Sequence, residues 1–252
     1  MRIARRVLPF SSVALFIALW QLAVSWSGAM LIPGPWAVAK GIVELAQRGL
    51  LLKYVVASLF RVTWGYLLAV ITSIPLGLLL GWHMRGEKAL NPLIQVFRPI
   101  SPLAWIPISI LWFGVGDMAA VFLIYLASFL PLLVTAMNAV HHLDRIHVNA
   151  GMNFGLSQRQ LVLRVIYPAV MPQLLVGLRI ALGVAWLVVV AAEMIAVNSG
   201  LGFLIMDSRN AGNRYDLVIA GMVLIGATGL VLDSGMRRLE NLKSLRWGYV
   251  RA

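Results

Sequence analysis

The sequence contains no cysteine, and only 12% of its 252 residues are charged. The absence of cysteine excludes disulfide frameworks, thiol catalysis and zinc sites with thiolate ligands. The charged fraction is about half of that in an average soluble domain, which leaves too few polar side chains to cover a soluble fold of this size. Apolar residues take their place and make up 61% of the chain. This composition predicts an integral membrane protein and excludes a disordered chain.

Long apolar runs divide the chain into about six membrane spans, because a bilayer core of roughly 30 Å needs about 20 apolar residues in a helix. The runs predict spans at about 7–26, 62–82, 99–116, 118–140, 174–197 and 217–235. Among them, the fifth carries an acid, Glu193. The sequence therefore predicts an all-α polytopic membrane helix bundle, with 1–252 as a single transmembrane domain.

The basic residues give the bundle an orientation. The net charge is +12, and most of the lysines and arginines lie in segments 1–6, 83–98, 141–172 and 236–252. Because the chain crosses the membrane an even number of times between them, these four segments lie on the same side as the N-terminus. Loops rich in basic residues usually stay in the cytoplasm. We therefore expect both termini in the cytoplasm, with the basic side chains near lipid headgroups and not on nucleic acid. A cleaved N-terminal signal peptide is disfavoured, because the first apolar run of about 20 residues exceeds the usual 7–15.

Two segments leave alternatives open. Pro99, Pro102 and Pro107 interrupt the third span, and each proline removes a backbone donor. Broken backbone at membrane depth survives only where protein or a water-filled cavity satisfies it, so these bends either line a translocation path or pack tightly. The outer segment 27–61 contains an amphipathic stretch with proline at its start, typical of a helix that lies on the membrane or covers the bundle.

The most informative segment is the inner loop 141–172. Gly155 is a natural stop in the left-handed conformation for a first helix. Ser157 and Gln160 have the spacing of a capping box, so a second helix begins just after the stop and should run until Pro168 ends it. The pattern predicts a rigid elbow on the cytoplasmic side, able to transmit a push from a soluble partner into the bundle.

These residues resemble the signature of permease subunits of binding-protein-dependent ABC importers. The family pattern Glu-Ala-Ala-x3-Gly-x9-Ile-x-Leu-Pro compares here with Asn149-Ala150-Gly151-x3-Gly155-x9-Val165-x-Tyr167-Pro168. Three positions match, whereas Asn149 replaces the glutamate and leaves the role of that side chain open. The stretches 98–117 and 177–202 are similar to the nitrate/sulfonate/taurine branch, and Asp207, Asn210 and Asp233 lean slightly toward nitrate, cyanate and bicarbonate members.

The resemblance implies a type I importer fold in a bacterial cytoplasmic membrane, and a pathway for a small oxyanion such as nitrate, bicarbonate, cyanate, an alkanesulfonate or taurine. It implies three kinds of partner: a second permease copy in a homodimer, two cytoplasmic ABC ATPases, and a periplasmic or lipid-anchored binding protein. ATP binding would open the permease halves outward, and hydrolysis would reset them. The residues that would couple to the ATPase are Asn149, Ala150, Gly151, Gly155, Leu156, Ser157 and Pro168.

The sequence offers no ATP site within the chain. Residues 81–88 come nearest to a P-loop, but Glu87 displaces the lysine and no hydroxyl residue follows. We therefore expect a chain that is not an enzyme and holds no cofactor, with ATP and Mg²⁺ bound by the partner ATPase. His141, His142 and His147 suggest a metal by residue type, but a solvated cluster at headgroup level is the preferred interpretation.

The substrate path has weaker candidates. An anion needs hydrogen-bond donors, which favours Ser101, Trp105 and Ser109 on the third span, Asn138 at the inner end of the fourth, and helix N-termini near the breaks. Glu193 is the remaining candidate, because ionisable residues within spans usually face a cavity. It would repel an anion, so a gating or structural role fits it better. Tryptophans at helical spacing are also typical of simple packing.

Two alternatives from other classes remain. A partner-independent channel or secondary transporter predicts ionisable residues paired across several spans, or inverted repeats, and an intramembrane enzyme predicts a nucleophile–base pair. The sequence shows neither pattern. The polar segment 198–216 is either a docking loop for an outer partner or a solvated loop.

Overall fold

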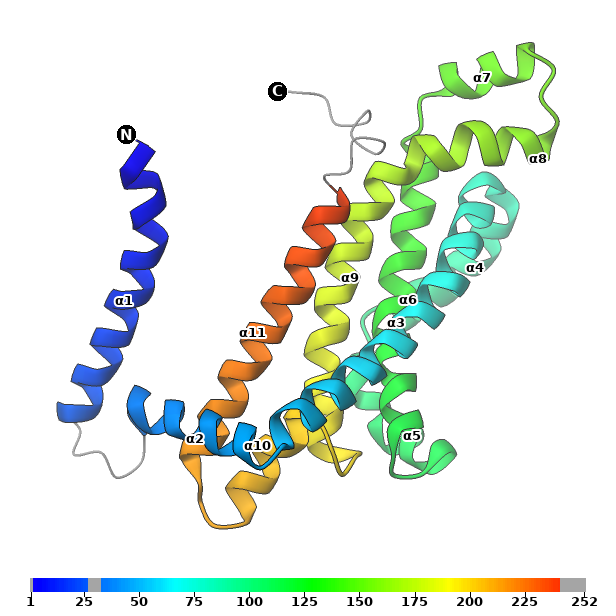
Figure 1. Ribbon diagram of the computed structural model, residues 1–252. Coiled ribbons are helices and arrows are strands. Elements are labelled where there is room, and N and C mark those ends of the chain that lie inside the picture. Colours follow the sequence, from blue (N-terminus) through cyan, green and yellow to red (C-terminus); the bar gives the residue numbers. More distant parts are fainter. Residues whose placement is uncertain (1, 27–32, 241–252) are drawn as a thin grey trace.

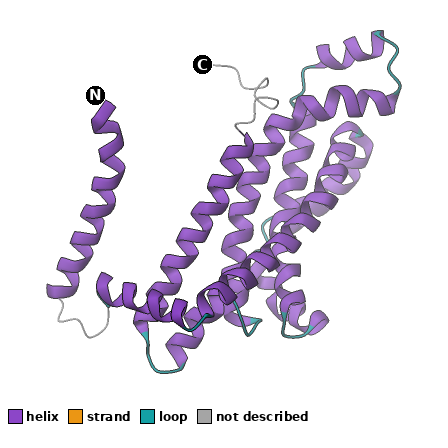
Figure 2. Ribbon diagram, viewed as in Figure 1, coloured by secondary structure: helices purple, strands orange, loops and turns teal. Residues whose placement is uncertain are grey.

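The computed structural model describes residues 2–26 and 33–240, and within these ranges every regular element is a helix (Figures 1 and 2). The elements are α1 (Arg2–Trp26), α2 (Pro35–Gln47), α3 (Leu50–Trp82), α4 (Met84–Phe97), the 3₁₀ turn η1 (Pro102–Trp105), α5 (Ile106–Phe113), α6 (Asp117–His141), α7 (Arg145–Asn153), α8 (Gln158–Leu161), the π turn η2 (Val162–Ile166), α9 (Tyr167–Ile195), α10 (Leu201–Asn210) and α11 (Tyr215–Glu240). The predicted all-α bundle is confirmed.

Four helical runs in the described part of the chain are long and apolar enough to cross a membrane: α3, α6, the run Gln158–Ile195 and α11. The bent pair Met84–Phe97 and Pro102–Phe113 has the composition of a fifth, either as one broken span or as a re-entrant loop. A shorter apolar segment, Ser11–Trp26, belongs to α1. Against the prediction of about six spans, the described residues therefore contain four helical runs of sufficient length and apolarity, or five with the bent pair.

Helix α6 occupies the centre of the bundle, between α3 and α9. Along α3, a small residue recurs every fourth position and faces α6: Gly65, Ala69, Ser73, Gly77 and Gly81. This spacing keeps one side of the helix free of bulk, so the two backbones approach closely. A Cβ atom added at Gly65 would lie 2.7 Å from Cβ of Ile124, closer than side-chain atoms pack.

We expect Gly65→Ala to destabilise the protein by about 1–3 kcal/mol, because overpacking forces the two helices apart. Gly183→Ala on α9 is the matched control, since a Cβ there meets nothing within 4 Å. Thermal unfolding of both variants in the same detergent measures the difference. Equal melting temperatures would show that α3 and α6 absorb the extra methyl group without cost.

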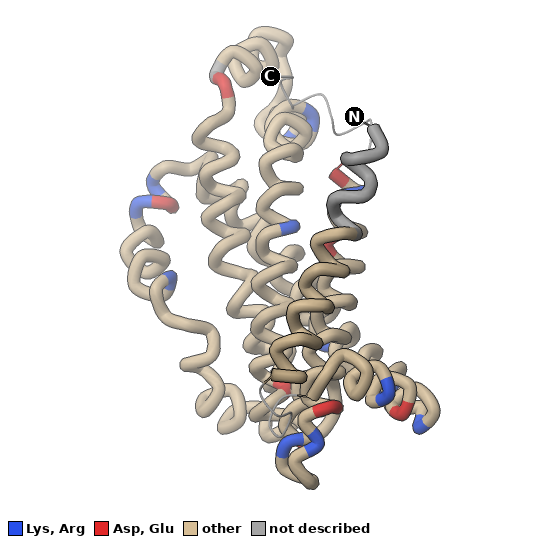
Figure 3. The backbone as a smooth tube through the Cα atoms, turned by 90° about the vertical axis from the view of Figure 1, so that its left-hand side faces the viewer, with Lys and Arg blue, Asp and Glu red and all other residues tan. Residues whose placement is uncertain are grey.

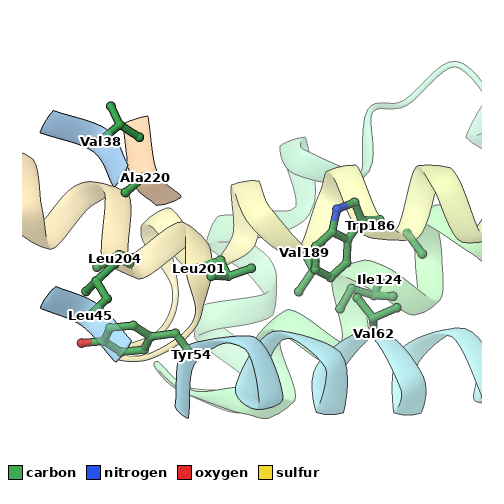
Figure 4. Close-up of a cluster of buried hydrophobic side chains, with 11 residues drawn as sticks. Val38, Leu45, Tyr54, Val62, Ile124, Trp186, Val189, Leu201, Leu204 and Ala220 are labelled. Atoms are coloured by element: carbon green, nitrogen blue, oxygen red, sulfur yellow. The ribbon is translucent and has the colours of Figure 1, made fainter. Parts of the chain in front are cut away.

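At the end of the bundle opposite α7 and α8, a hydrophobic cluster joins six helices (Figure 4). Val38 and Leu45 of α2 are buried there against α10 and α11, together with Tyr54 of α3. Helix α2 therefore covers the end of the bundle, one of the two interpretations that the sequence left open. The charged residues lie largely toward the two ends of the bundle (Figure 3).

The second span begins earlier than predicted. Helix α3 starts at Leu50, whereas the sequence placed residues 50–61 in an outer loop because Lys53 and Arg61 interrupt the apolar run. Arg61 is buried within the helix, where carboxylates neutralise its charge. A buried arginine with such partners does not stop a span, so the lower bound of 62 was wrong.

Prolines interrupt the third span, as predicted, but the apolar segment is a bent pair of helical pieces that begins before residue 99. The pieces Met84–Phe97 and Pro102–Phe113 meet at an angle of 83°. Pro102 begins η1 and Pro107 lies in the first turn of α5, where a missing N–H breaks no hydrogen bond. The prolines therefore start new helices instead of kinking one continuous helix.

The remaining spans lie close to their predicted positions, each with a difference in length. Helix α9 begins at Tyr167, not 174, and α11 extends to Glu240, not 235. The polar segment 198–216 is not a loop throughout, because it contains α10 with Leu201 and Leu204 buried. The basic residues Lys243, Arg246 and Arg251 lie outside the described residues.

Candidate functional site

The first part of the site is the elbow formed by α7 and α8 at one end of the molecule (Figure 1). Gly155 has φ +74°, the left-handed conformation that the sequence predicts for it. The turn satisfies the carbonyls at the end of α7, since Leu156 N donates to Gly151 O at 3.2 Å and Gly155 N donates to Met152 O at 2.9 Å. These two bonds form a Schellman motif, which fixes the direction in which the chain leaves α7.

The second helix of the elbow begins with the predicted capping box. Gln160 N donates to Ser157 Oγ at 3.4 Å, and Ser157 N donates to Gln160 Oε1 at 3.0 Å. The stop and the cap are therefore separated by a single residue, Leu156. A turn this short, closed on both sides by hydrogen bonds, makes the elbow rigid.

Pro168 does not end this second helix, contrary to the prediction. The helix continues through η2 into α9, and the run Gln158–Ile195 is helical throughout. Pro168 has no N–H to donate, and just before it the hydrogen bonding widens, with Tyr167 N donating to Val162 O. A π turn of this kind changes the spacing of the carbonyls, so the helix passes the proline without a break. The elbow is thus a direct extension of a span.

The structure separates the proposed coupling residues into two groups. Asn149, Ala150, Gly155 and Ser157 are exposed on the elbow, whereas Pro168 lies in the first turn of α9. Gly151 faces inward, and a Cβ added there would lie 2.7 Å from Leu161 Cδ1. Gly151 therefore holds α7 against α8. Three apolar side chains point outward near the turn, Ile146, Met152 and Phe154, and Phe154 is 86% exposed.

The second part of the site is a buried ion pair at the opposite end of the bundle. Arg61 of α3 donates through Nη1 to Glu193 Oε1 at 2.6 Å, and the side chains are 2% and 0% exposed. Arg61 Nε also donates to Asp117 Oδ1 at 2.8 Å, and Nη1 donates to the carbonyl of Ser199 at 2.8 Å. One guanidinium thus joins α3, the start of α6, the end of α9 and the loop before α10.

Glu193 also caps the first turn of α10. Its Oε2 accepts from Gly202 N at 3.0 Å and from Ser58 Oγ at 2.8 Å, while Ser58 Oγ accepts from Leu201 N at 3.0 Å. A carboxylate at a helix N-terminus satisfies unpaired donors and interacts favourably with the helix dipole. Gly200 has φ +107°, and a Cβ there or at Gly202 would collide with the Glu193 side chain.

The structure does not bring the other path candidates together. Ser101 accepts from Leu103 N and caps η1, and Ser109 donates to Ile106 O within its own helix. Trp105 stacks on Phe97 across the bend, with ring centroids 6.1 Å apart. Asn138 is exposed near the elbow end of α6. Within this chain, these side chains form no common anion site in the described conformation.

Further charged contacts connect other helices of the bundle. Arg214 Nη2 donates to Glu44 Oε2 at 2.6 Å and joins the start of α11 to α2. Hydrogen bonding to Arg214 lowers the pKa of Glu44, and hydrogen bonding to Asp216 and Glu44 raises the pKa of Arg214. Arg179 Nε donates to Asp233 Oδ1 at 2.6 Å and joins α9 to α11. His141 Nε2 lies 2.9 Å from Glu87 Oε2.

Comparison with known protein families identifies the chain. The family described as "Binding-protein-dependent transport system inner membrane component" matches residues 73–244, a range that contains the elbow and the run Gln158–Ile195. The chain belongs to this family. The family resemblance that the sequence predicted is therefore confirmed, and the protein is a multi-pass membrane protein of the ABC permease class.

Curated relatives match this permease over most of its length. A putative ABC transporter permease protein of Methanocaldococcus jannaschii is 38% identical, over 93% of this chain and 90% of that protein. The taurine transport system permease protein TauC of Escherichia coli is 32% identical, over 92% and 87% of the two chains. The nitrate import permease protein NrtB of Leptolyngbya laminosa is 34% identical, over 91% and 85%.

Solved structures are similar to this permease in fold. A chain of the MetNI methionine ABC transporter, in an inward-facing conformation, superposes with a TM-score of 0.68. The superposition covers 77% of this permease and 96% of that chain, at 18% sequence identity. The predicted type I importer fold is confirmed at this level.

Sequence reasoning missed four residues of the hydrogen-bond network around Arg61 and Glu193: Arg61, Ser58, Asp117 and Ser199 were not expected to meet there. Arg61 was counted as a loop residue, and its partner Glu193 is 132 positions away. One signal was present, because an acid inside an apolar span requires a partner at that depth. The permease has few arginines near the outer ends of its predicted spans, so a search for that partner would have found Arg61.

Proposed function

We propose that this permease forms the transmembrane pathway of an ATP-driven importer and receives its driving force through the elbow. The observation that carries the proposal is the continuity of the elbow with α9. The rigid turn at Gly155 leads into the run Gln158–Ile195 without an intervening loop. The exposed Ile146, Met152 and Phe154 supply apolar area, which is what a docking surface for a soluble protein needs.

In this proposal the permease itself is not an enzyme. ATP and Mg²⁺ are bound by two cytoplasmic ABC ATPases, one on each elbow of a permease homodimer, and a periplasmic or lipid-anchored binding protein delivers the substrate at the other end. Both termini lie in the cytoplasm of a bacterial cell, with the permease in the cytoplasmic membrane. Helix α1 begins and α11 ends at the same end of the bundle as the elbow (Figure 1). This supports an orientation in which both termini and the elbow share one side of the membrane.

We further propose that the substrate is a small oxyanion. Relatives of this chain are named for the transport of taurine, aliphatic sulfonates and nitrate, at 32%, 34% and 34% identity. Nitrate, bicarbonate, cyanate, alkanesulfonates and taurine are the candidates. Uptake of each labelled compound by cells with and without the permease gene tests this proposal. Uptake of methionine with no uptake of any oxyanion would contradict it.

The ATPase partner is tested by purification and by crosslinking. The permease should co-purify from native membranes with a soluble P-loop ATPase at about one copy each, as measured by mass spectrometry. Because the chain contains no cysteine, Phe154→Cys introduces a unique thiol at the elbow. Disulfide crosslinking to single-cysteine variants of that ATPase should succeed from position 154.

The matched control for crosslinking is Val115→Cys, which is 61% exposed beside the start of α6 at the opposite end of the bundle. It should give no ATPase adduct. A homo-oligomer without any ATPase, together with ion flux in the absence of ATP, would favour the alternative of a partner-independent channel or secondary transporter.

A further inference from the structure

A groove near the elbow has no role in the proposed function. It lies between the end of α3 and the run that begins with α8, and it encloses about 320 Å³. Pro75 and Leu78 of α3 form one wall, and Val162 and Leu163 of η2 form the other. Trp82 and Tyr167 lie one on each side, and Ile74, Leu79 and His83 complete the lining. The chamber is therefore apolar and opens between two membrane spans.

A more polar hollow continues from this chamber toward the elbow. The second hollow, of about 470 Å³, shares Trp82, His83, Val162 and Leu163 with the first and adds Gln158 and Arg159. Arg159 is exposed, and no ion pair with it is found among the described residues. The described residues that line the two hollows include no acid. The groove is thus apolar at its base and cationic at its mouth.

The position of the groove relative to the membrane follows from the two spans that border it. Helix α3 ends at Trp82, directly before a break at His83, and tryptophan and tyrosine are enriched at the boundary between lipid and water. A boundary at Trp82 would place the chamber on the lipid side and Arg159 on the water side. An arginine at this level attracts the phosphate of an anionic lipid.

We propose that this groove is a binding site for an anionic phospholipid such as phosphatidylglycerol. One acyl chain occupies the chamber between Leu78 and Leu163, and the phosphate accepts hydrogen bonds from Arg159. A lipid fits better than a soluble protein segment because the apolar chamber opens between two spans, where acyl chains are the surrounding solvent. The site does not depend on ATP or on the transported substrate.

Native mass spectrometry tests this site on the permease with the subunits that co-purify with it. After removal of endogenous lipid, the preparation is titrated separately with phosphatidylglycerol and with phosphatidylcholine of the same acyl chains. Phosphatidylglycerol should bind more tightly. Arg159→Gln should weaken its binding about fivefold and leave the weaker phosphatidylcholine binding unchanged, because one basic residue contributes about that factor near a lipid headgroup.

The matched control is Arg164→Gln. Arg164 is exposed on η2, five residues beyond Arg159, and does not line either hollow. This variant should bind phosphatidylglycerol like the unmodified protein. Equal affinity for the two lipids, or equal effects of the Arg159 and Arg164 variants, would overturn the proposal.

A photocrosslinking amino acid at position 163 gives a second, independent readout from inside the chamber. Illumination in vesicles of phosphatidylcholine with phosphatidylglycerol should yield a permease whose mass has increased by one phospholipid. A crosslink to a second permease copy or to another subunit would show that protein covers the groove, and the assignment to lipid would then be wrong.

Discussion

Replacing Arg61 with alanine is expected to destabilise the permease strongly, because Arg61 is buried and pairs with two carboxylates. The change leaves Glu193 and its capped helix α10 without the buried counter-charge, and also removes a partner of Asp117. Removing one member of a buried ion pair costs about 3–5 kcal/mol, because the remaining charge stays buried and unpaired. Thermal unfolding in detergent and the yield of folded protein measure the effect.

Two further variants separate the buried pair from charge loss in general. Arg48→Ala removes an arginine that pairs with Glu44 on the surface of α2, where the arginine side chain is 63% exposed, so its effect should lie below about 1 kcal/mol. Glu193→Gln keeps the size of the side chain and leaves Asp117 as a counter-charge for Arg61, so it should destabilise less than Arg61→Ala. If the Arg61→Ala and Arg48→Ala variants have the same melting temperature, the buried network does not hold these helices together.

Gly155→Val is expected to abolish substrate uptake while ATP hydrolysis by the assembled transporter continues. Gly155 has φ +74°, a conformation that a β-branched residue adopts only with strain. The substitution should open the Schellman turn and release α7 from its fixed angle to α8. Force from the ATPase would then bend the elbow and would no longer move α9. Measured in the same proteoliposomes, substrate uptake should be lost while ATPase activity remains.

Gly49→Val is the matched control for this experiment. Gly49 also has a left-handed φ, +69°, and a Cβ at either position meets nothing within 4 Å. The backbone strain is therefore similar, but Gly49 lies between α2 and α3, away from the elbow. Gly49→Val should reduce stability and retain coupling. Normal uptake by Gly155→Val, or equal loss of uptake in both variants, would contradict a specific role of the elbow turn.

The features that the sequence predicted correctly are those that neighbouring residues determine. The left-handed conformation at Gly155 and the capping box of Ser157 and Gln160 each depend on a few consecutive residues, and both are confirmed. The apolar content of the helices also follows from local composition. These features required no knowledge of how distant parts of the chain meet.

The predictions that were wrong depended on distant contacts or on the exact backbone path. Helix α3 contains a buried Arg61 because Glu193 of another helix neutralises its charge. The bend at 83° depends on the direction of the chain between Phe97 and Pro102, which the prolines allow but do not determine. Pro168 was expected to end a helix because proline has no N–H to donate. The π turn that lets the helix pass Pro168 leaves no pattern in the sequence.

The run Gln158–Ile195 has one further consequence. The Ser157 cap lies at one end, and Glu193, which holds the first turn of α10, lies near the other, roughly 50 Å away along the helical path at 1.5 Å per residue. The path changes direction between α8 and α9 (Figure 1). A single continuous run therefore carries contacts at both ends of the bundle. If this run tilts as a unit, we expect the elbow and the start of α10 to move in opposite directions. Opening at one membrane face would then accompany closing at the other without any signal passing through a loop.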